Sequence, residues 1–208
     1  MDLLLESNNI SDYLEPSEII DYNSEEIKEI VKKIKRESTS TMETIKNAYE
    51  FVRDNISHSA DINGKVVTCN ASEVLKAKEG ICYAKSHLLA AILRSLNIPT
   101  GFCYQKLVLE DDIKPWLIIH GLNAVYIEEL NKWIRLDARG NKDGVNAEFS
   151  IDEEKLAFPV REELGEEDIL VIYSKPDDNV IRALRSCNTV EELFDNLPTE
   201  LADEIKNK

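Results

Sequence analysis

The stretch KEGICYAKSHLLAAILRSLNIP, from Lys78 to Pro99, predicts a buried helix with a cysteine at its first turn. The run Leu88 to Leu96 leaves almost no polar face, which is typical of a helix covered on all sides. Asn97 and the proline after it are expected to end this helix. Gly80 allows a sharp turn of the backbone just before Cys82. The helix is therefore central to the fold, and its cysteine stands where a thiol either packs or reacts.

Apolar periodicity predicts further helices on both sides of this stretch. A stripe at i, i+3, i+4 and i+7 marks a first helix, with Ile27, Ile30, Val31 and Ile34 as its buried positions. Residues 41–55 form a second helix with a similar stripe. Asn70-Ala-Ser-Glu73 is a capping pattern that opens a short helix, which we expect Gly80 to end. A capping pattern at Asn188 to Glu191 predicts one more helix in the tail.

The chain changes character after residue 100. Segments 101–109, 116–127, 133–139 and 169–173 are rich in β-branched and aromatic residues, as strands are. Helices followed by a mostly antiparallel sheet predict an α+β fold in which the cysteine helix packs on the sheet. We expect residues 1–40 to form an N-terminal arm and helix of the same domain, 41–175 the core, and 176–208 a helical tail.

Composition limits the classes of partner and compartment. The formal net charge of −15 disfavours binding to nucleic acid or an anionic membrane, because both would be repelled. The N-terminal MDLLLESNNI resembles neither a signal peptide nor a membrane span. The four cysteines form no C-x-x-C pair and have no histidine at zinc spacing. We therefore expect a cytoplasmic protein with reduced thiols, no bound metal and no cofactor.

Cys82 is the best placed of the four cysteines for chemistry. A helix N-terminus and a nearby imidazolium both favour the reactive thiolate form of a cysteine. The N–H groups of the first helical turn are also available to stabilise an oxyanion. Cys69 precedes a helix cap, Cys103 lies within a strand, and Cys187 is near the tail helix.

A nucleophilic cysteine needs a histidine base and a group that orients it. His87 lies inside the buried helix, where we expect a core role, and His58 lies in a polar loop. His120 lies at the start of a strand, just before Gly121, and is the candidate base. If Tyr126 pairs with the tryptophan at 133, Asp137 becomes a same-face diagonal neighbour of His120.

Each of these residues also has a purely structural interpretation. A buried cysteine usually packs, an isolated strand histidine is usually structural, and Asp137 suits a turn. A shift of one residue in strand register would put His120 and Asp137 on opposite faces. Spacing alone leaves the catalytic and structural interpretations of Cys82 open.

Three blocks of the sequence together resemble the transglutaminase-like superfamily, which has a papain-like core. They are Gly80-Ile-Cys82 with the following helix and its Asn97-Ile-Pro exit, His120-Gly-Leu-Asn-Ala-Val-Tyr-Ile, and Trp133-Ile-Arg-Leu-Asp137. Asn97 replaces the usual glycine, and Gly121 stands where an aromatic usually follows the histidine. The resemblance covers roughly residues 45 to 140. It implies Cys82 as nucleophile, His120 as base and then acid, and Asp137 as the orienting carboxylate.

The resemblance implies acyl transfer through a thioester on Cys82. Hydrolysis of a peptide, protein or small amide substrate is the first expectation, since water is the simplest acceptor. The alternatives are an amine-using acyltransferase and a catalytically silent domain that binds a protein or peptide. No second oxyanion donor stands out: Asn70 is a weak candidate, while Tyr83, His58 and Trp116 could line a cleft. We expect the irregular stretch around 141–165 to shape access to the site.

Overall fold

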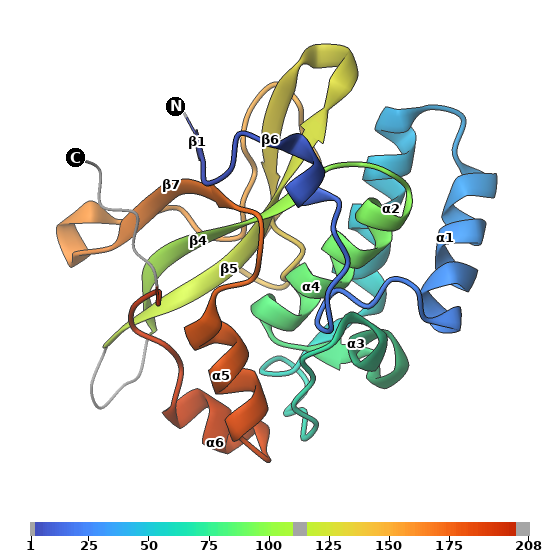
Figure 1. The fold of residues 1–208 in the computed structure, drawn as a ribbon. Helices are drawn as coiled ribbons and strands as arrows, with labels where there is room; N and C mark the ends of the chain where they lie inside the picture. The colour runs from blue at the N-terminus through green and yellow to red at the C-terminus, as the bar shows by residue number, and fades with distance from the viewer. Residues whose placement is uncertain (1–2, 110–115, 203–208) are drawn as a thin grey trace.

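The computed structural model describes residues 3–109 and 116–202, and Figure 1 shows their arrangement. Helices α1 (Glu25–Glu37), α2 (Thr41–Asn55) and α3 (Ala71–Ala77) gather on one side of the molecule. Helix α4 (Cys82–Ser95) lies between them and a twisted sheet. Helices α5 (Asp178–Ser186) and α6 (Val190–Asp195) lie beside one end of that sheet. The fold is α+β, as the sequence predicts.

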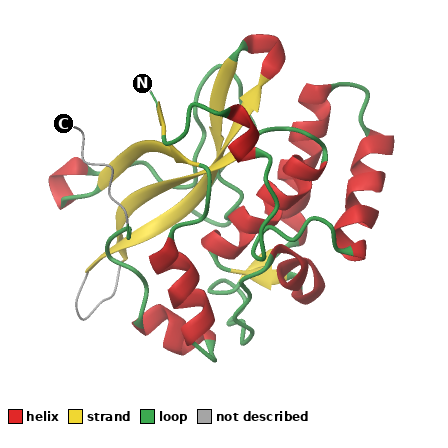
Figure 2. Ribbon diagram, in the orientation of Figure 1, coloured by secondary structure: helices red, strands yellow, loops and turns green. Residues whose placement is uncertain are grey.

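The sheet has five strands in the order β1-β7-β4-β5-β6, and Figure 2 distinguishes the strands, in yellow, from the helices, in red. They are β1 (Leu4–Leu5), β4 (Thr100–Leu109), β5 (Trp116–Ile127), β6 (Lys132–Leu136) and β7 (Glu167–Tyr173). All neighbours are antiparallel except β1 and β7. Two short strands, β2 (Ser57–His58) and β3 (Glu79–Gly80), form a separate parallel pair beside α4.

Local chemistry accounts for the helix ends. Ser24 and Ser40 accept hydrogen bonds from backbone N–H groups in the first turns of α1 and α2. Asn97 follows α4 with a φ of 60°, the left-handed conformation that asparagine tolerates. Helix α3 ends earlier than predicted, because Lys78 adopts the left-handed cap conformation and Gly80 joins β3.

Helix α4 is the centre of the core, as its sequence predicts. Every residue from Cys82 to Arg94 is buried, and the helix contacts α1, α2 and α3 on one side and β4 and β5 on the other. Arg94 donates to the backbone oxygens of Glu15, Thr100 and Ser174 and so joins the N-terminal arm to β4 and the end of β7. None of the helices in the described ranges is long and apolar enough to cross a membrane.

The register between β5 and β6 agrees with the prediction. Tyr126 pairs with Trp133, and their rings lie 5.5 Å apart between centroids. The ladder ends at Asn123 and Leu136, three residues short of the predicted strand end at 139. Helix α5, which begins at a cap formed by Asp177, was not predicted as a separate helix.

Candidate active site

Cys82 is the first residue of α4, where backbone N–H groups precede the first helical hydrogen bond. That bond runs from Lys85 N to Ile81 O at 3.0 Å, and Ile81 at the N-cap has no side chain able to accept. Cys82 is 9% exposed and lines a cavity of about 490 Å³. Cys82 therefore lies at the wall of this cavity, at the positive end of a helix dipole.

Tyr83 fixes the first turn of α4 against β5. Its hydroxyl donates to the backbone oxygen of Ile119, and its ring fills the space over Gly121. A Cβ atom at residue 121 would lie 2.8 Å from the Tyr83 ring, closer than packed carbon atoms approach. Glycine at this position thus lets the cysteine helix come close to the strand that carries His120.

His120 and Asp137 meet beyond the end of the β5–β6 ladder. The distance from His120 Nε2 to Asp137 Oδ2 is 2.8 Å, and both side chains are buried. This contact confirms the same-face arrangement that the register predicts. Because Nε2 is engaged, Nδ1 is the ring nitrogen left for the Cys82 thiol, and His120 and Cys82 line the same cavity.

The Asp137 carboxylate is held at three points. Besides His120, it accepts from the backbone N–H groups of Arg139 at 3.0 Å and Ala157 at 3.1 Å. Burial favours the neutral carboxyl, but His120 and these N–H groups outweigh it and lower the pKa of Asp137. Burial likewise favours neutral imidazole, but the charges of Asp137 and Cys82 raise the pKa of His120.

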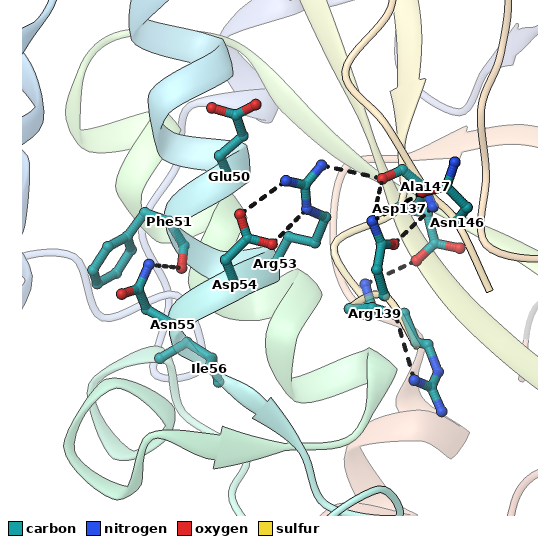
Figure 3. Close-up of polar contacts among 12 residues, drawn as sticks. Glu50, Phe51, Arg53, Asp54, Asn55, Ile56, Asp137, Arg139, Asn146 and Ala147 are labelled. Atoms are coloured by element: carbon teal, nitrogen blue, oxygen red, sulfur yellow. Dashed lines mark hydrogen bonds and ion pairs between the residues drawn. The ribbon is translucent and has the colours of Figure 1, made fainter. Parts of the chain in front are cut away.

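The segment after Asp137 is tied to helix α2 and to the loop after β2. Figure 3 shows Arg53 of α2, which binds Asp54 and also donates to Ala147 O at 3.1 Å. The same view shows the bond from Arg139 N to Asp137. The guanidinium of Arg139 and the amine of Lys142 share the carboxylate of Asp61. The segment that follows Asp137 is thus held by α2 and by the loop after β2.

The cavity has walls from distant parts of the chain. Lys142, Gly144, Phe158, Pro159 and Arg161 belong to the irregular stretch, which confirms that it shapes access. Phe158 packs edge-on against the His120 ring at 5.2 Å between centroids. The other walls include His58 and Tyr83 near Cys82, and side chains of β4, β5 and the segment from α6 onward.

His58 lines the cavity, as the sequence analysis allowed, but its pairing next to the cysteine helix was not predicted. Strand pairing sets His58 opposite Gly80, two residues before Cys82. Its Nδ1 atom is buried without a hydrogen-bond partner. Burial first, and then the charge of Arg139, lower the pKa of His58 to about 3, so its imidazole is neutral at pH 7. The only signal in the sequence was a histidine near the Asn63-Gly64 turn.

Several other residues that the sequence analysis considered lie outside the site. His87 is a core residue whose Nδ1 lies 2.8 Å from Cys69 O, as predicted. Asn70 caps α3 and Trp116 does not line the cavity, so neither belongs to the site. Burial raises the pKa of the Cys69 thiol to about 11 and that of Cys103 to about 12. Within the described ranges, His, Cys, Asp and Glu side chains form no group of three or more suited to a metal ion.

A cysteine at the start of a buried helix, next to a histidine and an aspartate on an antiparallel sheet, defines a papain-like class of α+β protein. The family model described as the transglutaminase-like superfamily matches residues 28–138. The chain therefore belongs to the transglutaminase-like superfamily. No curated protein sequence matches the chain significantly.

Three solved structures are similar to this chain, and the first of them supports the fold. A proposed cysteine protease from Cytophaga hutchinsonii is 18% identical, with a TM-score of 0.52 over 64% of this chain and 43% of that one. The periplasmic domain of TgpA from Pseudomonas aeruginosa, bound to ethylmercury, is 12% identical, with a TM-score of 0.42 over 53% and 42%. A TGase is 16% identical, with a TM-score of 0.43 over 68% and 37%. The match thus spans less than half the length of each of these structures.

Proposed function

We propose that this protein is a cysteine-dependent acyl-transfer enzyme that hydrolyses a peptide or other amide bond through a thioester on Cys82. The observation that carries the proposal is the position of His120 beside a buried carboxylate and in one cavity with the Cys82 thiol. Its Nε2 atom is 2.8 Å from Asp137, and His120 and Cys82 line the same cavity. A purely structural histidine has no need of a thiol on one side and a buried carboxylate on the other.

The reaction follows from these positions. The Cys82 thiolate attacks the amide carbonyl carbon, a C–S bond forms, and the carbonyl oxygen becomes an oxyanion. As the C–N bond breaks, His120 gives its proton to the leaving amine. Water then gives a proton to His120 and attacks the thioester, and the C–S bond breaks to release the acid and restore the thiolate. Asp137 keeps His120 oriented and stabilises its charged form throughout.

Two groups are suited to stabilise the oxyanion. The first is the backbone N–H of Cys82, which is free of helical bonding at the start of α4. The second is His58, whose neutral ring lines the same cavity. A neutral imidazole suits this role, because it donates a hydrogen bond without competing with His120 for the proton.

Alkylation of the native protein with iodoacetamide, with each cysteine mapped by mass spectrometry, tests the nucleophile. Cys82 should label faster than the other three cysteines, and Cys82→Ala should abolish hydrolysis of p-nitrophenyl acetate. Addition of a primary amine then shows whether water or an amine accepts the acyl group. Hydrolysis gives the free acid, whereas a transglutaminase-like reaction gives the new amide. Labelling of Cys82 no faster than Cys187 would contradict the proposal.

A further inference from the structure

The cavity beside Cys82 has an apolar end whose wall comes partly from outside the segment that the family model matches. Its side chains are Leu107 and Leu109 of β4, Ile118 of β5, and Phe194 and Leu197 of the α6 region. The match to the family model ends at residue 138, so the part of the wall near α6 lies outside it.

The apolar side chains of the sheet adjoin the His120 ring. Residues two apart in a strand share a face, so Ile118 lies on the same face as His120. Leu107 is the cross-strand partner of Ile118, and Leu109 follows two residues later on that face. The apolar floor thus begins beside His120 and runs away from it along β4 and β5.

The C-terminal segment is fixed against the same point of β5. Ile119 donates its N–H to Pro198 O at 2.8 Å, and its backbone oxygen accepts the Tyr83 hydroxyl. The segment is also held at its far ends, because Asp177 receives N–H bonds from the first turn of α5 and, at 2.8 Å, from Ala202. Phe194 and Leu197 are therefore held on an anchored wall close to the nucleophile.

Among the described residues, the charged groups nearest to this apolar end are paired with each other. Glu166 accepts from Val108 N at 3.0 Å between the two leucines of β4, and Arg161 pairs with it at 2.6 Å. A charged substrate group placed against the five apolar side chains would lose its hydration without finding a free partner among the described residues. An apolar group placed there would gain from leaving water.

We propose that this end of the cavity is an acyl-group subsite, so that the enzyme acts on amides whose acyl part carries a bulky apolar group. The proposal rests on the proposed function, since it assumes that Cys82 takes up the acyl group. The volume of about 490 Å³ lies within the range of small-molecule sites and accommodates a side chain together with the reacting amide.

Activated esters of graded length test the subsite without knowledge of the natural substrate. The probes are p-nitrophenyl acetate, p-nitrophenyl hexanoate and mono-p-nitrophenyl glutarate, which has a similar reach but ends in a carboxylate. Cys82 sulfur attacks the ester carbonyl, the C–S bond forms, the C–O bond breaks, and p-nitrophenolate leaves with the electron pair. After correction for spontaneous hydrolysis, hexanoate should acylate Cys82 at least about tenfold faster than either of the others.

Two variants assign that preference to the C-terminal wall. Phe194→Ala should reduce the hexanoate-to-acetate ratio to below about threefold, whereas Phe51→Ala, a half-buried phenylalanine of α2 outside the cavity, should leave it unchanged. If Phe194→Ala fails to fold, Phe194→Trp serves instead, because a larger ring should slow hexanoate selectively. Equal rates for the three esters on wild-type Cys82 would overturn the subsite alone. Absence of any acyl-Cys82 would instead overturn the proposed function.

Discussion

His120 and Asp137 form a 2.8 Å hydrogen bond at a point where their strands no longer pair with each other. The ladder between β5 and β6 stops at Asn123 and Leu136, one residue before the aspartate. Asp137 is then held by the N–H groups of Arg139 and Ala157 rather than by the sheet. The carboxylate is thus fixed by the irregular segments that also line the cavity.

Replacement of Asp137 by asparagine should leave the fold intact and reduce acyl transfer. The amide retains an oxygen acceptor but not the charge that keeps His120 protonated, so we expect kcat to fall by about 100-fold to 10,000-fold. Steady-state hydrolysis of p-nitrophenyl hexanoate measures this. Asp168→Asn is the matched control, because Asp168 pairs with Arg135 on the same sheet outside the cavity. Equal losses in the two variants would show that Asp137 has only a structural role.

The close approach of Tyr83 to Gly121 predicts strong coupling between these positions. Gly121→Ala adds a Cβ atom 2.8 Å from the Tyr83 ring, so we expect a loss of about 1–3 kcal/mol in the free energy of unfolding. Tyr83→Leu removes both the ring and the hydroxyl bond to Ile119. In urea denaturation the double variant should lose less stability than the sum of the two single variants. Simple additivity would mean that the helix and strand do not meet in this way.

Sequence reasoning succeeded where local pattern and one cross-strand pair determine the outcome. The apolar stripes predict α1, α2 and α4, and the Tyr126–Trp133 pair predicts the register that brings Asp137 to His120. It failed where distant segments meet. The parallel pairing that brings His58 opposite Gly80 joins residues more than twenty positions apart. A strand of two residues is also too short to be indicated by a periodic pattern. The wall formed by Phe194 likewise depends on tertiary packing alone.

Arg94 should be essential for stability and not replaceable by lysine. Its guanidinium is buried and donates to three backbone oxygens in different parts of the chain, those of Glu15, Thr100 and Ser174. The single ammonium group of lysine cannot donate to all three oxygens at once. Arg94→Lys should therefore lower the free energy of unfolding by about 3 kcal/mol, because it leaves buried oxygens unpaired. Arg36→Lys on the exposed side of α1 should change the unfolding free energy by no more than about 0.5 kcal/mol.

Acidification should destabilise the protein through His58. Burial, followed by the charges of Arg139, Lys85 and His120, lowers the pKa of His58 to about 3 in the folded state, and the opposing charge of Asp61 offsets only part of this shift. The unfolded chain, with a pKa of about 6.5 for histidine, binds one more proton between these values, so stability falls as pH falls through this window.

Urea titrations of wild type and His58→Asn between pH 6 and 4 isolate this effect. The wild type should lose about 1.4 kcal/mol per pH unit more than the variant. The pKa of Asp137 is lowered, so the stability that its carboxylate contributes is lost only below about pH 3.8. The pKa of His120 is raised, so the stability that it contributes is lost only as the pH rises above about 6.5. Parallel curves for the two proteins would show that His58 is already charged in the folded state.

The proposed oxyanion role of His58 can be separated from any effect on the thiolate by two reactions of the same cysteine. Alkylation by iodoacetamide is substitution at a saturated carbon and forms no oxyanion, whereas acylation by p-nitrophenyl acetate passes through one. Asparagine and leucine are similar in size, but only the amide of asparagine can donate a hydrogen bond in place of the imidazole N–H.

His58→Leu should therefore slow acylation by about 100-fold to 1,000-fold while alkylation stays within about threefold of wild type. His58→Asn should retain acylation to within about tenfold, because a neutral donor still faces the developing charge. A parallel loss of both reactions would instead mean that His58 acts on the Cys82–His120 pair. Equal impairment by asparagine and leucine would mean that the ring serves packing, and the Cys82 N–H would then act without it.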